Sequence, residues 1–344
     1  MGAGKVNKTL MPQSAHLSYY KQPGENNCYQ TNALQMKILV TGGAGFIGSH
    51  IVEQLHGRAE VRVLDNLRSG HRHNLAGFRS EFIEGSILDR EAVRRAMAGV
   101  DYVFHLAAMV SVPESMLQPV ECVEVNTTGT LIVLEEAARA GVKKLAFSSS
   151  AAIYGNNPAG PKVETMMPEP VSPYAVTKLD GEFYCAMFAR EKKLATVSLR
   201  YFNVFGPRQD PRSQYAAAVP AFLERALKNE PLTIYGDGEQ TRDFVPVQTV
   251  AAANIFLATQ SAATGVCNVA GGEAITINQL ATAICELADS RSEIRHAAER
   301  AGDVKHSRAD ITRLRAAGFV DKVDFTAALR TTVAAMKAVT KPET

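Results

Sequence analysis

The sequence predicts an α/β fold, a doubly wound parallel sheet with a smaller mixed α/β domain interleaved with it. Two observations support this prediction. Short apolar runs alternate with segments of helical periodicity from residue 36 to residue 201, as expected for successive βαβ units. From residue 207 the alternation becomes irregular, which indicates a second domain of mixed structure.

The composition excludes several classes of protein. At 344 residues with 46% hydrophobic content, the chain is long enough for one large and one smaller domain. The 37 Lys and Arg nearly balance the 35 Asp and Glu, so we expect neither nucleic acid nor a membrane as a partner. The five cysteines lie far apart without a Cys-x-x-Cys pair, which indicates a reducing, cytoplasmic location and no metal site.

Residues 1–35 differ from the rest of the chain. They are polar and show neither helical nor strand periodicity. They also lack the apolar core of a signal peptide and the Arg-rich pattern of a transit peptide. We therefore expect a leader or tag, partly disordered, ahead of a first strand that directly follows Met36.

The first predicted strand leads into a glycine-rich turn, within the run from residue 37 to residue 48. Gly42 permits a sharp turn, Gly45 lets the backbone approach a pyrophosphate, and Gly48 lets the following helix pack closely. The next strand ends at Asp65, at the position where a carboxylate binds the ribose hydroxyls of NAD. The sequence therefore predicts a Rossmann domain with NAD as its cofactor.

The pattern after Asp65 predicts the remaining elements of this domain. Strands are expected near 81–84, 101–105, 143–148 and 194–201, and helices near 89–98, 117–139 and 173–190. Small residues follow the strand at 101–105, where a flat cofactor needs room. His105 ends that strand, and we expect it to be a packed, hydrogen-bonded side chain and not a catalytic one.

A candidate catalytic group begins at the helix that follows Ser172 and Pro173, an N-cap and first-turn pair. Tyr174 and Lys178 lie one turn apart on the same face of this helix. A neighbouring ammonium ion favours the phenolate and should lower the pKa of tyrosine from ~10 toward neutral pH. Ser150, at the end of an earlier strand, could share the proton with a substrate hydroxyl. Alone, the Tyr-x-x-x-Lys spacing would fit a surface helix equally well.

Together these motifs resemble the extended short-chain dehydrogenases/reductases, most closely the branch of UDP-hexose 4-epimerases that act on UDP-N-acetylglucosamine. The likeness runs from Met36 to about Ala335, through Thr41–Gly48, Asp65–Asn66, His105–Ala108, Ser148–Gly155, Ser172–Lys178, Arg200–Pro207 and Gly236–Phe244. It implies that Ser150, Tyr174 and Lys178 are catalytic and that Asn126 supports them. It also implies a homodimer formed through the helices near 117–139 and 173–190.

The resemblance implies a set of cofactor-binding residues around the glycine turn and the sheet edge. They are Gly42, Gly45, Phe46, Ile47, Gly48, Asp65, Asn66, Ser69, Gly70, Ile87, Leu106, Ala107, Ala108, Asn126, Ser148, Tyr174, Lys178 and Tyr201. One position departs from the family pattern. Ser86 stands where an acidic residue often meets the adenine amine, so we expect that contact to be lost or replaced.

The predicted division of the chain is interleaved. Residues 36–206 and 241–263 are expected to form the NAD-binding domain, and residues 207–240 and 264–344 the UDP-sugar-binding domain. Further elements are predicted as helices near 219–227, 276–288, 308–316 and 324–337, and a strand at 232–235. Thr249 is expected to cap the helix of the segment 243–260, which should rejoin the main sheet.

The substrate-binding residues also follow from the resemblance. They are Ser150, Tyr174, Asn203, Ala218, Val219, Tyr235, Arg242, Arg300, Asp303 and Ser307. Arg242 and Arg300 would hold the diphosphate, as guanidinium groups do well, and Asp303 the ribose. Val110 stands near the sugar where a smaller or a basic residue is usual, so the pocket wall there departs from the pattern.

The predicted activity is NAD-dependent 4-epimerisation of UDP-hexoses through a 4-keto intermediate. Tyr174 removes the 4-hydroxyl proton, hydride passes from C4 to NAD, and the keto sugar turns before hydride returns to its other face. Ser307 should border the 2-substituent, where a small residue leaves room for an N-acetyl group. UDP-N-acetylglucosamine and UDP-N-acetylgalactosamine are thus expected substrates, together with UDP-glucose and UDP-galactose. Alternatively, Ser307 is a surface helix residue and Val110 fills that space.

Three other functions stay open at this point: a UDP-glucuronate 4-epimerase, a nucleotide-sugar 4,6-dehydratase, and a non-catalytic NAD-binding sensor. In dehydratases an Asp-Glu pair follows the catalytic Ser or Thr, whereas this chain has Ala151 and Ala152, which cannot transfer a proton. A sensor would need the glycine turn but not an intact Ser150, Tyr174 and Lys178.

Overall fold

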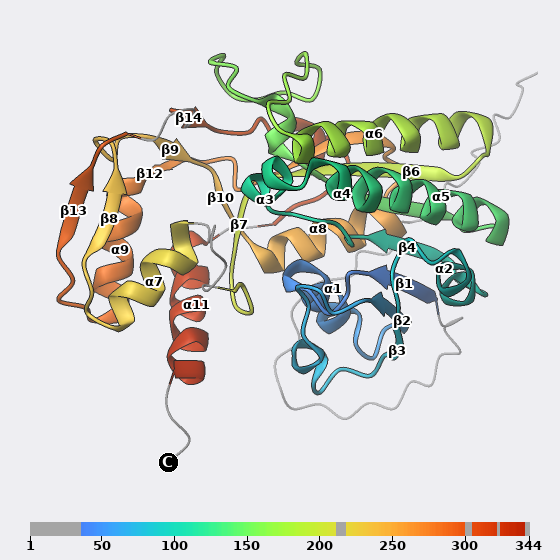
Figure 1. Ribbon diagram of the computed structural model, residues 1–344, viewed down its shortest axis with the longest axis horizontal. Coiled ribbons are helices and arrows are strands. Elements are labelled where there is room, and N and C mark those ends of the chain that lie inside the picture. Colours follow the sequence, from blue (N-terminus) through green and yellow to red (C-terminus); the bar gives the residue numbers. More distant parts are fainter. Residues whose placement is uncertain (1–35, 211–217, 300–304, 322–323, 341–344) are drawn as a thin grey trace, which may run out of the picture. The chain divides into compact units, whose positions relative to one another are not determined.

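A seven-stranded parallel sheet organises the first two thirds of the chain (Figure 1). The computed structural model describes residues 36–210, 218–299, 305–321 and 324–340, so the expected leader at 1–35 lies outside it. The strands are β1 (Lys37–Thr41), β2 (Glu60–Asp65), β3 (Glu81–Glu84), β4 (Tyr102–His105), β5 (Lys144–Ser150), β6 (Ala195–Tyr201) and β11 (Gly265–Val269). They lie in the order β11-β6-β5-β4-β1-β2-β3, which confirms the predicted doubly wound sheet.

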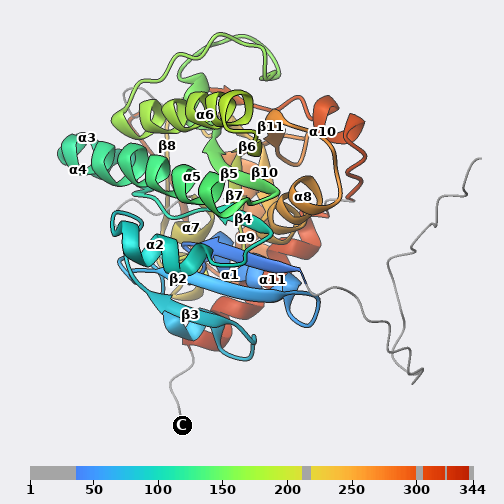
Figure 2. The same ribbon diagram turned by 90° about the vertical axis from the view of Figure 1, so that its right-hand side faces the viewer.

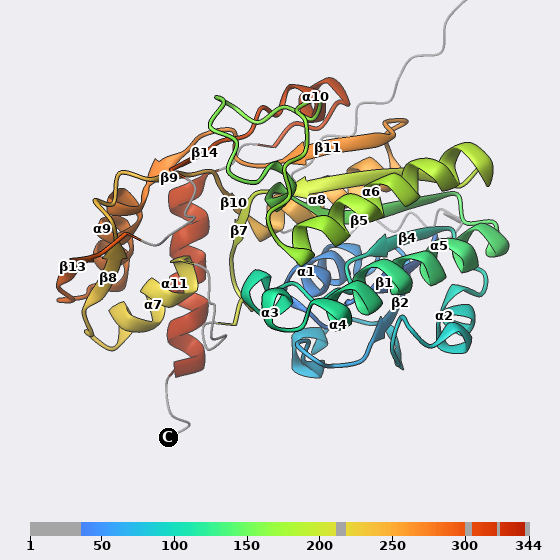
Figure 3. The same ribbon diagram turned by 45° about the horizontal axis from the view of Figure 1, so that its top comes forward.

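Helices cover both faces of this sheet. One face packs against α1 (Phe46–Leu55) and α8 (Val247–Thr259), and the other against α2 (Arg90–Met97), α5 (Gly129–Ala140) and α6 (Pro173–Glu191). Figures 2 and 3 show α5 and α6 side by side on their face, with α6 over β5 and β6. Two apolar cores therefore enclose the strands, as a parallel sheet requires.

The helix predicted near 117–139 is divided into several segments. They are α3 (Val112–Leu117), α4 (Pro119–Val123), the single π-helical turn η2 (Glu124–Thr128) and α5. Asn126 lies in this π turn and is 2% exposed. Such single π turns are frequent at functional sites.

The remaining residues form a second apolar core around short sheets. Its elements are β7 (Asn203–Phe205), α7 (Ala218–Leu227), β8 (Leu232–Tyr235), β9 (Thr241–Arg242), β10 (Phe244–Pro246), β12 (Ile275–Thr276), α9 (Ile277–Ala288), β13 (Ile294–Ala297), β14 (His306–Ser307) and α11 (Phe325–Thr340). The sequence assigns the helix α10 (Thr312–Ala316) to the second domain, but its Leu314 packs into the core of the main sheet. The strands pair as β10-β7, β12-β9-β14 and β13-β8. Side chains of α7, α9 and α11 close this core.

Three other local predictions are wrong. β11 pairs with β6 in the main sheet, although the sequence assigns residues from 264 onward to the second domain. Thr249 is not a cap, because α8 already begins at Val247, after Pro246. The helix expected from residue 308 begins at Thr312, and Ser307 lies in a strand instead.

Among the described residues, none of the helices is both long enough and apolar enough to cross a membrane. Across the same ranges, no three His, Cys, Asp or Glu side chains gather as metal ligands would.

Lys144 provides a test of how the sheet and α8 are held together. Its buried amine donates hydrogen bonds to the backbone oxygens of Leu257, Ser261 and Ala263, at the end of α8. Replacing Lys144 by Met leaves these carbonyls without a donor and should lower the free energy of unfolding in urea by about 2–3 kcal/mol. The neighbouring exposed Lys143, paired with Asp101, is the control, and Lys143→Met should cost less than about 1 kcal/mol. Equal losses for the two variants would contradict this assignment.

Candidate active site

The glycine turn between β1 and α1 has the close backbone packing that the sequence predicts. Gly42 has a φ of +71°, in the left-handed region that favours glycine. A Cβ at Gly48 would lie 2.2 Å from the carbonyl oxygen of Gly42, so only glycine fits there. Gly45 is the N-cap residue of α1, and no side chain caps this helix. The start of α1, at Phe46 and Ile47, is therefore open to an anion.

Asp65 lies beside this turn at the end of β2. One oxygen of its buried carboxylate accepts a hydrogen bond of 2.9 Å from the backbone N–H of Ala44, and the other accepts one of 2.8 Å from that of Leu67. Each oxygen keeps a lone pair for a ribose hydroxyl. Gly70 lies close against this carboxylate, because a Cβ at Gly70 would lie 3.0 Å from an Asp65 carboxylate oxygen. The residues present thus fit a dinucleotide.

The other predicted cofactor residues lie at the same edge of the sheet or on the helices above it. Leu106 and Ala107 follow β4 and donate backbone hydrogen bonds to the carbonyl and hydroxyl oxygens of Thr41. Ser148 on β5 lies near the hydroxyl of Tyr201 on β6, which donates to the side-chain oxygen of Asn254 at 2.8 Å. The remaining residues are Asn66 and Ser69 after β2, Ile87 against Gly129 of α5, and Ala108 after β4.

The three predicted catalytic side chains meet between β5 and α6. The Ser150 hydroxyl lies close enough to Tyr174 to affect its phenol, and its oxygen accepts the backbone N–H of Ala152 at 3.1 Å. The Lys178 nitrogen lies 5.7 Å from the centroid of the Tyr174 ring and 5.2 Å from that of Phe147. An acid or base, a hydroxyl partner and a cation are therefore present in one buried site.

The electrostatics of this site differ from the expectation. Burial raises the pKa of Tyr174, with a smaller contribution from Cys122, while the hydrogen bond from Ser150 acts in the opposite direction. The expected lowering by Lys178 is absent because the desolvation of the partly buried phenol dominates. Burial also lowers the pKa of Lys178, to about 8. Lys178 nevertheless stays largely protonated at pH 7.

His105 is packed and neutral, as expected. The Thr130 hydroxyl donates to the backbone oxygen of Asn126, so it accepts a hydrogen bond of 2.9 Å from Nε2 of His105. Nδ1 then accepts the hydroxyl of Thr41 at 2.7 Å. Complete burial lowers the pKa of His105 to about 3. This histidine is held in one tautomer and does not act as a base.

Asn126 supports the site through three hydrogen bonds. Its side-chain oxygen accepts the backbone N–H of Met109, and its nitrogen donates to the Met109 carbonyl and to the Thr177 hydroxyl. Thr177 in turn donates to the backbone oxygen of Tyr174, and Ser115 of α3 accepts the Tyr174 N–H. The sequence reasoning missed Thr177 and Ser115. No pattern identifies them, because their partners are far away in the sequence.

The predicted substrate residues lie mostly in the short sheets of the second core. Arg242 on β9 is the direct register partner of Ser307 on β14, and Tyr235 ends β8. Asn203 starts β7 and donates a side-chain hydrogen bond to the Asp243 carbonyl. Ala218 and Val219 begin α7. Val110 is 60% exposed. Arg300 and Asp303 lie outside the described residues.

Asp243 joins these short sheets to the main one. Its buried carboxylate accepts backbone N–H groups of Gly271, Gly272 and Ala309, while its own N–H donates to the Ser307 carbonyl. Burial outweighs these hydrogen bonds and raises the pKa of Asp243 to about 6. This aspartate therefore has a structural role next to Arg242.

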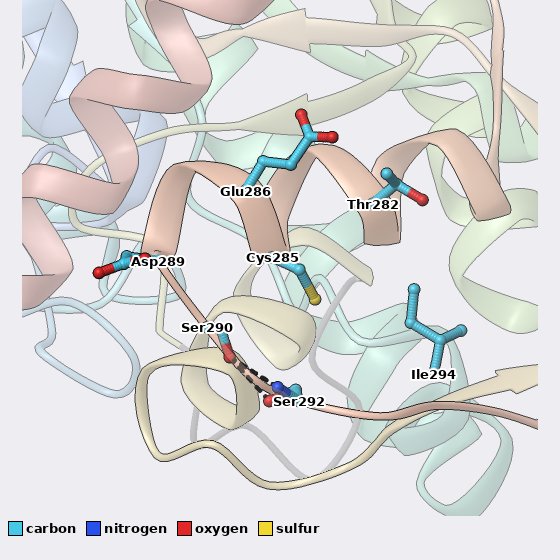
Figure 4. Close-up of a pocket in the computed structure, with 7 residues that line it drawn as sticks. All are labelled: Thr282, Cys285, Glu286, Asp289, Ser290, Ser292 and Ile294. Atoms are coloured by element: carbon cyan, nitrogen blue, oxygen red, sulfur yellow. Dashed lines mark hydrogen bonds between the residues drawn. The ribbon is translucent and has the colours of Figure 1, made fainter.

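A separate pocket lies at the end of α9 and the start of β13 (Figure 4). It has a volume of about 260 Å³ and is lined by Thr282, Cys285, Glu286, Asp289, Ser290, Ser292 and Ile294. None of these is a predicted site residue.

Comparison with known proteins agrees with this geometry. The UDP-N-acetylglucosamine 4-epimerase of Methanobrevibacter ruminantium, solved in complex with UDP-N-acetylmuramic acid, is 42% identical, with a TM-score of 0.86 over 89% of this chain and 99% of that one. The Thermus thermophilus UDP-glucose 4-epimerase, solved with NAD, is 41% identical, with a TM-score of 0.81 over 88% and 99%. The UDP-glucose 4-epimerase of Mycolicibacterium smegmatis is 37% identical over 81% of this chain and 91% of its own. These relatives are isomerases. The model of the NAD dependent epimerase/dehydratase family matches residues 38–270, and the chain belongs to that family.

Proposed function

We propose that the chain is an NAD-dependent UDP-sugar 4-epimerase that acts on UDP-N-acetylglucosamine and UDP-N-acetylgalactosamine, and also on UDP-glucose and UDP-galactose. The observation that carries this proposal is the position of the Lys178 nitrogen, 5.7 Å from the ring centroid of Tyr174, with Ser150 beside them at the sheet edge that bears the glycine turn. The epimerases among its relatives support the same reaction.

The proposed chemistry assigns one role to each side chain. Tyr174 takes the proton of the sugar 4-hydroxyl and later returns it, with the Ser150 hydroxyl hydrogen-bonded to both oxygens. Lys178 stabilises the phenolate by its charge. NAD, held by the glycine turn and Asp65, supplies the hydride acceptor and donor at C4 when it is bound. The two residues after Ser150 are Ala151 and Ala152, in the 3₁₀ turn η3 (Ala151–Tyr154), so no carboxyl group follows to carry out a dehydration.

Tyr174→Phe tests the proposed acid and base. The variant keeps the ring and its packing but has no ionisable oxygen. We expect kcat for UDP-galactose to fall by about 10²- to 10⁴-fold, while the NAD bound per chain, measured after denaturation, stays at the wild-type level. Unchanged turnover with normal NAD content would show that Tyr174 is not the acid and base, whereas a wild-type protein that binds NAD but turns over no sugar would favour the sensor.

The proposed preference for acetamido sugars depends on Ser307. β14 places it directly beside Arg242, the proposed diphosphate ligand, so its side chain would face the sugar end of a bound nucleotide. Serine is small and leaves room for a 2-acetamido group. The position of Ser307 in a strand, and not in a surface helix, supports this proposal.

Replacing Ser307 by Tyr should fill that space. We expect turnover of UDP-N-acetylgalactosamine to fall on the order of 100-fold, while turnover of UDP-galactose changes little, because only the larger 2-substituent clashes. The four sugar nucleotides are compared side by side without added reductant. His306→Tyr is the matched control, because adjacent residues of a strand face opposite ways. Equal losses on both sugar types would refute the gating role.

We also propose a homodimer formed through α4 and α6. Exposed apolar side chains lie on both helices: Val120, Val123, Val176, Phe183 and Met187. Phe183 is 63% exposed, which is unusual for a phenylalanine on the surface of a monomer. A second copy of the chain, meeting the first through the same two helices, would bury this surface.

Phe183→Asp places a charge at the centre of that surface. We expect light scattering to report half the wild-type mass, with an unchanged circular dichroism spectrum. Met167→Asp, which changes another exposed apolar side chain outside both helices, should leave the mass unchanged. A wild-type mass for Phe183→Asp would place the interface elsewhere.

A further inference from the structure

Helix α6 carries a buried carboxylate, Glu182, one turn beyond Lys178 and two turns beyond Tyr174. The spacing puts all three on one face of the helix. Glu182 has a side chain only 4% exposed, and it accepts two hydrogen bonds from Arg200 on β6, from Nε at 2.8 Å and Nη2 at 2.7 Å. The Ser149 hydroxyl donates a third, at 2.5 Å. The proposed chemistry uses none of these three groups.

The Glu182–Arg200 ion pair is connected to the sheet at Ser149, the residue immediately before Ser150. Ser149 and Arg200 are register partners on β5 and β6, so their side chains share one face. Glu182 therefore connects α6 to two strands at once. Burial would lower the pKa of Arg200, but the hydrogen bonds and charge of Glu182 outweigh it and raise that pKa. The guanidinium group thus stays charged and firmly paired.

Arg200 also holds the chain that follows Ser150. Its guanidinium carbon lies 4.8 Å from the ring centroid of Tyr154, in the 3₁₀ turn η3. The Tyr154 hydroxyl donates to the side-chain oxygen of Asn268 on β11, at 2.7 Å. Ser150 consequently stands between two residues, Ser149 before it and Tyr154 after it, that both contact the Arg200–Glu182 pair.

We propose that Arg200 and Glu182 are positioning residues that hold the end of β5 against α6, so that the Ser150 hydroxyl stays in place beside Tyr174. This inference rests on the proposed epimerase function for its effect on rate. Stability alone cannot test it, because removing one partner of any buried ion pair destabilises a protein. The test therefore needs a variant in which the whole network is replaced and a measurement made on Tyr174 itself.

The decisive variant is Ser149→Ala/Glu182→Met/Arg200→Met. It substitutes apolar side chains for the pair and leaves no unpaired hydroxyl at position 149, a replacement that buried ion pairs tolerate. It removes one positive and one negative charge, so the net charge stays the same. The ionisable groups facing Tyr174 are Lys178 on its own helix, Cys122 from α4 and Tyr201 from β6, and the variant retains them.

The measurement is the ultraviolet titration of tyrosinate in the holoenzyme, with the same variant carrying Tyr174→Phe as the blank. Because the Ser150 hydrogen bond lowers the pKa of Tyr174, its loss should raise that pKa by about 0.5 unit or more. We expect kcat to fall at least about tenfold with KM nearly unchanged, and the pH profile of kcat to move to higher pH. Arg200→Lys, which keeps the charge but not the two-pronged geometry, should show a smaller shift in the same direction.

Glu136→Gln is the matched control. Glu136 is another buried carboxylate paired with arginines, Arg90 and Arg94, but it lies between α2 and α5. It should lower the unfolding midpoint without changing the Tyr174 titration or kcat. A folded triple variant or Arg200→Lys with the wild-type Tyr174 pKa and kcat would overturn the proposal. A wild-type protein with no epimerase activity would instead refute the proposed function, and the titration would still decide the positioning role.

Discussion

The close approach of α6 to β5 is the constraint on which the candidate site depends. Gly181 faces the ring of Phe147, and a Cβ at that position would lie 2.2 Å from the ring. The absent side chain lets the helix axis approach the strand, which brings Tyr174 close to Ser150. Phe147 lies under the Lys178 ammonium group and beside His105, so one aromatic ring packs against both side chains.

The parallel arrangement of the strands brings the other residues of the site to one edge of the sheet. Since all seven strands run the same way, the ends of β1, β2, β4 and β5 meet at one edge, and their following loops carry the glycine turn, Asp65, Ala107 and Ser150. The proposed substrate-binding residues are connected to this edge through Asp243. Its carboxylate accepts backbone hydrogen bonds from two later segments, at Gly271 and Ala309. The buried side chain of Asp243 therefore helps to fix the positions of Arg242 and Ser307 relative to the main sheet.

Local sequence patterns explain which parts of the fold and of the candidate site could be predicted. The glycine turn, Asp65 and the Tyr174–Lys178 pair each carry a spacing that forces a particular backbone or face, so the sequence predicts where they lie once these motifs are considered together. The assignment of β11 could not be foreseen, because an apolar strand does not reveal which sheet it joins. The same holds for Ser307, which is a strand residue only through its pairing with β9. The raised pKa of Tyr174 depends on burial, which no spacing encodes.

The order of the chain has a consequence for folding during synthesis. β6 is complete at Tyr201, but its outer neighbour β11 arrives only with residues 265–269, after β7 to β10 and the helices α7 and α8 have been made. Until then the edge of β6, which bears Val197 and Leu199, has no strand to pair with. The unpaired backbone groups of such an apolar edge can pair with a strand of another nascent chain. A late-arriving strand of this kind makes completion of the sheet a slow, long-range step, and places the period of greatest aggregation risk between the synthesis of β6 and that of β11.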